Sequence, residues 1–128
     1  RPYIYTTAMS PLNALAIRQA LQWNQSEAGE AARAILQQHI QQFRTGAAEI
    51  GLSLWDAPSA IQPLLLGSSQ TALEWSEQLK QQGLWVSAIR PPTVPVGQAR
   101  LRITLSASHA PEHIAQLLAA LKTIHAKQ

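Results

Sequence analysis

An arginine in front of a double proline is the side chain best placed to do chemistry in this sequence. Arg90 precedes Pro91 and Pro92, and Pro95 follows in the same stretch. Proline fixes its own φ and pushes the preceding residue toward extended backbone, so Arg90 has less freedom to lose when it binds a partner. A planar guanidinium pairs with a carboxylate through two hydrogen bonds. The pattern favours a preformed anion contact, and the alternative is a solvated arginine at the end of a strand.

The histidines give weaker signals. His109 and His113 are four residues apart, a spacing that can place two imidazoles on one helical face. No third ligand is nearby and no glutamate occupies the metalloprotease position, so we expect no metal site and place His109 in the turn before the last helix. His39 falls on the apolar stripe of a long helix, where we expect a buried histidine with its hydrogen bonds satisfied.

The composition limits what the chain can bind. Its net charge is +3 with 13% charged residues and no block of like charges, so nucleic acid is not an expected partner. The absence of cysteine excludes disulfides and cysteine-based metal or redox chemistry. No apolar run approaches the roughly 18 to 20 residues that span a bilayer. We therefore expect no membrane partner. The absence of cysteine is compatible with the cytosol, and we expect a cytoplasmic protein.

Helix signals occur in four places. Ser10-Pro11 is a helix start with serine as N-cap and proline at the first position. A second start at Ser26 opens a 3.6-residue apolar period that continues to Gly51. The remaining two helices are predicted from Ser68 or Ser69 to Gln82, with Gly83 as the C-terminal glycine, and from Pro111 onward.

Strand signals alternate with the later helices. We predict strands at residues 60–66, 84–89 and 100–106, and Pro63 restricts the first to an edge or an irregular position. The last strand alternates strictly between apolar and polar residues. The predicted fold class is α+β, with a small, mainly antiparallel sheet and helices packed on it. We predict a single domain over residues 1–128: a connecting loop and helix (1–25), a long helix (26–51) and the sheet part (52–128).

Several motifs together resemble one known family. IRPPTVP (Ile89–Pro95) leads into GQARLRITLSASH, and upstream lie IYTTAMSP (Ile4–Pro11), SAIQPLLLG and LKQQGLWVSAIRPPTVP. These runs are similar, nearly end to end, to the C-terminal part of the pyridoxal-phosphate-dependent α-oxoamine synthases. The IRPPTVP run favours the biotin-pathway branch. The resemblance implies the C-terminal small domain of a fold-type I pyridoxal-phosphate enzyme.

The resemblance also implies an activity for the full-length enzyme. That branch is an acyltransferase that joins L-alanine to pimeloyl-CoA or pimeloyl-acyl carrier protein with loss of CO2, giving 8-amino-7-oxononanoate. Its cofactor is pyridoxal 5'-phosphate and its expected assembly is a homodimer. By resemblance, Arg90 binds the substrate carboxylate and Thr93 is the other substrate contact in the loop. For Thr93 the alternative is a hydroxyl that satisfies a loop carbonyl.

Two threonines near the start form a second candidate site by resemblance. The loop that matches IYTTAMSP approaches the cofactor phosphate of the neighbouring subunit, and the hydroxyls of Thr6 and Thr7 can donate to it. The helix start at Ser10 also offers free N–H groups that suit an anion. Ala8 departs from the family, which often has serine there. Local hydrogen bonding of the two hydroxyls is the alternative.

The family's cofactor lysine has no counterpart in this sequence. Lys80, Lys122 and Lys127 occupy polar helical positions and match no family motif. The sequence also opens without methionine, so we expect a piece of a longer enzyme whose cofactor-binding large domain is missing, inactive alone and with no catalytic residue of its own. Apolar surface on Tyr3-Ile4-Tyr5 and on the first helix should then be exposed. The alternative function is a stand-alone anion-binding or interaction module built on Arg90, Arg100 and Arg102.

Overall fold

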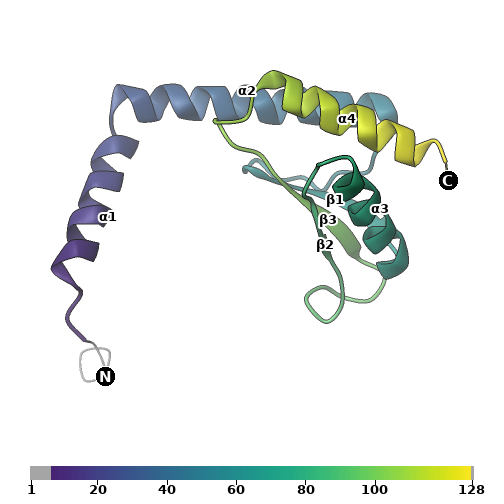
Figure 1. Ribbon diagram of the computed structural model, residues 1–128, viewed down its shortest axis with the longest axis horizontal. Coiled ribbons are helices and arrows are strands. Elements are labelled where there is room, and N and C mark those ends of the chain that lie inside the picture. The colour runs from purple at the N-terminus through teal and green to yellow at the C-terminus, as the bar shows by residue number, and fades with distance from the viewer. Residues whose placement is uncertain (1–6, 128) are drawn as a thin grey trace. The chain divides into compact units, whose positions relative to one another are not determined.

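The computed structural model describes residues 7–127 and has the expected order of helices and strands (Figure 1). The described elements are α1 (Pro11–Asn24), α2 (Glu27–Ile50), β1 (Ile61–Gly67), α3 (Ser69–Gln81), β2 (Ser87–Ile89), β3 (Ala99–Thr104) and α4 (Pro111–His125). The α+β class predicted from the sequence is confirmed. None of the helices in this described range is long and apolar enough to cross a membrane.

The chain divides into two compact units between Ala34 and Ile35. The first unit contains α1, the turn at Ser26 and the beginning of α2. Ser26 Oγ accepts a hydrogen bond from Gly29 N (3.3 Å), so Ser26 caps α2 as predicted. Arg33 donates from α2 to the backbone and side-chain oxygens of Asn24 at the end of α1. These bonds fix the turn between the two helices.

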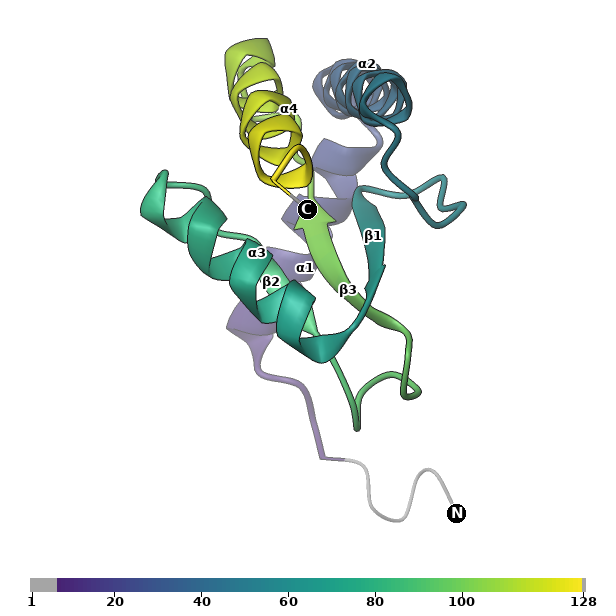
Figure 2. The same cartoon turned by 90° about the vertical axis from the view of Figure 1, so that its right-hand side faces the viewer.

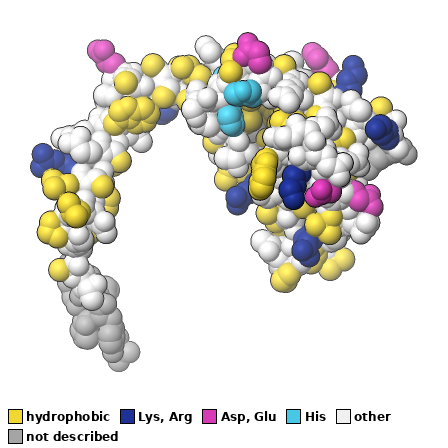
Figure 3. Space-filling model, viewed as in Figure 1, with side chains coloured by type: hydrophobic (Ala, Val, Ile, Leu, Met, Phe, Trp, Pro, Cys, Tyr) yellow, Lys and Arg dark blue, Asp and Glu magenta, His cyan; other side chains and the backbone are white. Residues whose placement is uncertain are grey.

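The apolar side chains of α1 are exposed in the described structure. None of its residues is buried, and Leu12 is 76% exposed. Figure 3 shows apolar side chains along this helix. The predicted exposure of the first helix is therefore confirmed, whereas Tyr3-Ile4-Tyr5 lies outside the described residues. Because no residue of α1 is buried in the described structure, this helix adds little to the core.

The second unit is built on a three-stranded antiparallel sheet in the order β1-β3-β2. Pro63 lies in β1 opposite Arg102, and β1 is an edge strand, as predicted. The carbonyl of Pro63 accepts from Trp55 N (2.9 Å) on the side away from β3. A residue's N–H and C=O point to the same side of a strand, so the missing N–H of Pro63 costs no bond to β3.

Two predicted strands are too long. Residues 84–89 were expected in one strand, but β2 contains only Ser87–Ile89. The preceding residues are held by α3 instead, because Leu84 N donates to Leu79 O and Ser76 Oγ donates to Val86 O (2.6 Å). The last predicted strand, 100–106, ends at Thr104, since Ser106 already belongs to the turn before α4.

The core lies between one face of the sheet and the helices. Leu101, Ile103 and Leu105 are buried, while Arg102 and Thr104 on the opposite face are exposed, which confirms the predicted alternation. In Figure 2, α3 lies across the strands and α4 runs beside α2. Helices α2, α3 and α4 contribute most of the remaining buried side chains, namely Ile40, Phe43, Ala47, Ala72, Trp75, Leu79, Ile114, Leu117, Ala120, Leu121 and Ile124.

His39 is one of two buried polar residues in the described range. Its Nδ1 lies 3.0 Å from Ser106 O, and a carbonyl can only accept, so Nδ1 is protonated and donates this bond. This bond joins α2 to the segment after β3. The expected core histidine with satisfied hydrogen bonds is confirmed.

Candidate functional site

The candidate site is the loop of residues 90–98 that connects β2 to β3, here called the Pro-rich loop. Arg90 follows Ile89, whose partner in β3 is Arg100. The carbonyl of Arg90 accepts a hydrogen bond from Thr93 N (3.1 Å), so the backbone turns at once. The peptide bond between Pro91 and Pro92 is cis. Both Arg90 and Thr93 are exposed, and a single turn brings these two predicted contacts together.

The far part of the Pro-rich loop is a second turn. Gln98 N donates to Pro95 O (3.1 Å), and Gly97 has a φ of 81°. Glycine adopts this left-handed conformation without the strain that a Cβ would introduce. The chain then enters β3 at Ala99, which is fully buried. The two turns give the loop a defined shape between fixed strand ends.

Arg100 ties the Pro-rich loop to the rest of the second unit. Its Nε donates to Gln98 O (3.0 Å) and one terminal nitrogen donates to Gln98 Oε1 (3.1 Å). The same guanidinium lies over the ring of Trp55, 5.1 Å from its centroid. Cations are attracted to aromatic faces at this distance. Arg100 is therefore held by two partners. The alternative of a stand-alone anion-binding module requires this guanidinium to be free for an anion.

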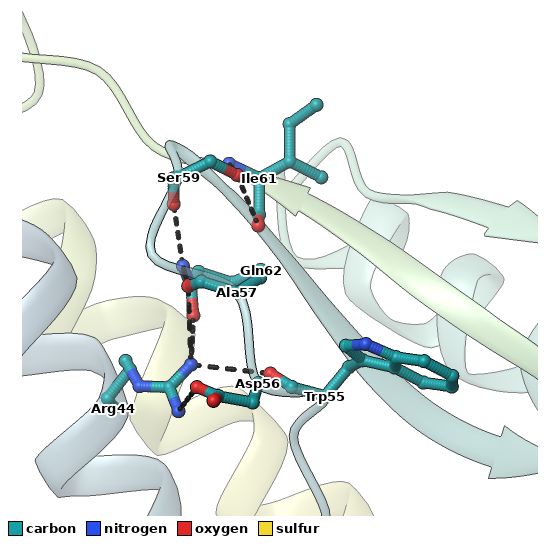
Figure 4. Close-up of polar contacts among 7 residues, drawn as sticks. All are labelled: Arg44, Trp55, Asp56, Ala57, Ser59, Ile61 and Gln62. Carbon is teal, nitrogen blue, oxygen red and sulfur yellow. Dashed lines mark hydrogen bonds and ion pairs between the residues drawn. The ribbon is translucent and has the colours of Figure 1, made fainter.

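Trp55 belongs to a segment that is anchored to α2 (Figure 4). Arg44 of α2 donates to Trp55 O (3.3 Å) and to Gln62 Oε1 (3.0 Å), and it pairs with Asp56 (3.4 Å). Gln62 is fully buried, and its amide donates to Ala57 O (2.9 Å) and Ser59 O (2.6 Å). One buried amide and one guanidinium thus fix the chain between α2 and β1.

The second predicted site is described only in part. Thr6 lies outside the described residues, and Thr7 is exposed ahead of α1. Ser10 is the N-cap residue of α1 but makes no side-chain capping bond. The Ser10 side chain therefore leaves the first N–H groups of α1 free to bind an anion. Thr7 belongs to the first unit, and Arg90 and Thr93 to the second.

The histidine pair has a structural role at the start of α4. His109 Nδ1 accepts from Ser106 N and His113 Nδ1 accepts from Ala110 N, each at 3.2 Å. A neutral imidazole that accepts at Nδ1 carries its proton on Nε2. In this arrangement neither ring has a lone pair left for a metal. Both rings line a hollow of about 440 Å³ beside β3, to which the described site residues Thr7, Arg90 and Thr93 do not contribute.

Sequence reasoning missed the residues that support the loop. Trp55 lies outside every motif, and Gln98 and Gln62 lie within the motifs GQARLRITLSASH and SAIQPLLLG without having been singled out as supporting residues. Trp55 and Arg100 are 45 positions apart in the sequence, so no local period links them. The three lysines, Lys80, Lys122 and Lys127, are exposed, as their polar helical positions suggested.

Comparison with known proteins agrees with the motifs. The family model described as aminotransferase class I and II matches residues 1–121. The chain is 60% identical over 121 residues to an 8-amino-7-oxononanoate synthase of Hydrogenovibrio crunogenus, and 57% identical to one of Yersinia pestis. Each match covers 94% of this chain, which spans 30% and 31% of the lengths of these two curated relatives.

Solved structures share the fold. A serine palmitoyltransferase from S. paucimobilis, with a bound pyridoxal-phosphate adduct of myriocin, matches 99% of this chain and 32% of its own with a TM-score of 0.86 and 25% identity. An 8-amino-7-oxononanoate synthase from Francisella tularensis matches 96% of this chain and 34% of its own with a TM-score of 0.74 and 29% identity. Sequence motifs, fold and family match point the same way, and the chain belongs to the aminotransferase class I and II family.

Proposed function

We propose that these residues form the C-terminal domain of an 8-amino-7-oxononanoate synthase. The whole enzyme would be a cytoplasmic homodimer that joins L-alanine to a pimeloyl thioester, carried by coenzyme A or acyl carrier protein, with loss of CO2. The observation that carries this proposal is the 60% identity over 94% of the chain to a relative of that name. The proposal is supported by the turn from Arg90 to Thr93, which leaves both side chains exposed and so could admit a carboxylate substrate.

Arg90 would bind the carboxylate of the amino acid. Its backbone is held by the turn to Thr93 and by the strand pairing of Ile89 with Arg100. A side chain on a fixed backbone loses less entropy on binding, and its planar fork matches the two oxygens of a carboxylate. Thr93, three residues on, would donate its hydroxyl to the same carboxylate or to the acyl oxygen. The domain would thus orient the substrate.

Pyridoxal phosphate fits this chain in one respect. Thr7 and the N-terminus of α1, where Ser10 makes no side-chain capping bond, can donate hydrogen bonds to a phosphate, whereas the exposed lysines on α3, on α4 and after α4 match no family motif. The cofactor, when bound, supplies an electron sink for a carbanion. In the dimer, Thr6 and Thr7 would contact the phosphate held by the neighbouring subunit, and the lysine that holds the cofactor would lie in the large domain.

The decisive experiment is a chimera in which these 128 residues replace the matching segment of the Hydrogenovibrio crunogenus relative. We expect it to condense L-alanine with a pimeloyl thioester. Arg90→Ala removes a charge-assisted contact of about 1.5 to 3 kcal/mol and should lower kcat/KM by roughly ten- to a hundredfold. Arg90→Lys should recover part of the loss, because it keeps the charge but not the planar fork.

The matched control is Lys122→Ala, which removes one positive charge from an exposed position on α4. It should leave kcat/KM unchanged, which would exclude a general effect of net charge. A folded chimera without condensation activity would contradict the proposed function. Wild-type kcat/KM in Arg90→Ala would contradict the carboxylate role alone.

A further inference from the structure

We infer that Trp55 is a positioning residue for the substrate carboxylate, acting through Arg100 and Gln98 on the Pro-rich loop. This inference rests on the proposed function and adds a residue that does not touch the substrate. Trp55, Arg100 and Gln98 are called the loop brace below. All three lie in the second unit, and Arg100 contacts both Trp55 and Gln98.

The Arg100 guanidinium is held in place by Gln98. Its Nε and one terminal nitrogen donate to the backbone and side-chain oxygens of Gln98, at 3.0 and 3.1 Å. A planar guanidinium that makes two bonds in one plane leaves its faces free for stacking. The ring of Trp55 covers the guanidinium at 5.1 Å. The aromatic ring therefore favours the rotamer in which Arg100 reaches Gln98.

Gln98 and Arg90 stand at opposite ends of the Pro-rich loop. Gln98 N closes the second turn of the Pro-rich loop on Pro95 O, and Arg90 stands at the other end of the same loop. Arg100 is also the strand partner of Ile89, the residue before Arg90. Arg100 thus holds both ends of the loop, by backbone pairing at one and by side-chain bonds at the other. Releasing Gln98 would widen the range of positions open to Arg90.

The backbone of Trp55 is itself anchored. Its N–H donates to Pro63 O (2.9 Å) and its carbonyl accepts from Arg44 (3.3 Å), so the backbone is fixed on both sides. Its side chain is nevertheless 47% exposed and is absent from the apolar core cluster. A tryptophan with a fixed backbone and a half-exposed ring contributes little to the core. Its described side-chain partner is Arg100.

The test compares KM and kcat of three forms of the active chimera: Trp55→Leu, Trp55→Phe and the unchanged protein. We expect Trp55→Leu to raise KM for L-alanine about two- to fivefold, the range of a lost cation–π contact at an exposed site. KM for the pimeloyl thioester and kcat should change less than twofold. Trp55→Phe keeps an aromatic face and should restore most of the affinity for alanine. A purely structural loss would instead lower the active fraction, and so kcat, at constant KM.

The matched control is Trp85→Leu, because Trp85 is 84% exposed and its described cation contact is Lys80, not Arg100. It should leave KM for alanine unchanged. Gln98→Ala is the second variant, which keeps Trp55 if Trp55→Leu does not fold, and it should raise the same KM about two- to tenfold through one lost bond to Arg100.

The outcomes separate the two proposals. If Arg90→Ala raises KM for alanine while Trp55→Leu and Gln98→Ala do not, the loop brace is refuted and the proposed function stands. If Trp55→Phe is as impaired as Trp55→Leu, the aromatic contact is not the cause and the inference is also refuted. If Arg90→Ala has no effect, the carboxylate role fails and the brace fails with it.

Discussion

Replacing Gln62 by leucine should be a costly single change in the second unit. Gln62 is fully buried in β1, and its amide group makes three hydrogen bonds in the described structure: it donates to Ala57 O and Ser59 O and accepts from Arg44. Leucine has a similar size but no polar atom. Gln62→Leu would therefore remove one donor from each of two carbonyls and one acceptor from the Arg44 guanidinium, while filling nearly the same volume. Of these groups, Ala57 O keeps a bond from Arg44 (3.5 Å).

The expected magnitude follows from the type of each bond. A neutral hydrogen bond contributes about 1 kcal/mol net and one to a charged group about 1.5 to 3 kcal/mol. Part of this is regained, because Ser59 is exposed and the Arg44 side chain is 34% exposed, so water can replace the lost partner. The buried methyl groups of leucine offset a further part. We expect Gln62→Leu to lower the free energy of unfolding by about 2 to 4 kcal/mol.

The assay is urea unfolding of the chain followed by circular dichroism, with the free energy of unfolding extrapolated to water. Gln38→Leu, on the exposed side of α2, is the control and should change stability by less than about 0.5 kcal/mol. Arg44→Ala combined with Gln62→Leu should cost less than the sum of the two single changes, because they share a bond. A loss below about 0.5 kcal/mol for Gln62→Leu would refute the reasoning.

Two further predictions concern helix ends. Ser68 Oγ accepts a hydrogen bond from Thr71 N (3.2 Å) at the start of α3, so Ser68→Ala should lower the free energy of unfolding by about 0.5 to 2 kcal/mol. Ser10→Ala removes no capping bond and should not lower it. Thermal unfolding compares the two variants, and equal effects would contradict the capping argument. A Cβ on Gly29 would lie 2.7 Å from the backbone oxygen of Asn24, so Gly29→Ala should reduce helix content by circular dichroism despite the higher helix propensity of alanine, and increased helix content would contradict this.

The local structure could be predicted from the sequence because its causes are local. The order of helices and strands, the cap at Ser26, the alternation along residues 99–104 and the left-handed Gly83 all follow from neighbouring residue types. The turn that unites Arg90 with Thr93 is of the same kind, since prolines within the segment restrict it. The sequence therefore determined the α+β class and located the candidate loop.

Tertiary structure decided which residues support that loop. Residues 84–86 left the predicted strand because Ser76 and Leu79 of α3 bind their backbone, a competition that their own sequence does not record. Gln62 is a buried polar anchor only because Arg44 and the Ala57 carbonyl meet it, and Trp55 contacts Arg100 of β3. These contacts join positions that are distant in the chain. Their energies depend on three-dimensional proximity, which no local period or propensity encodes.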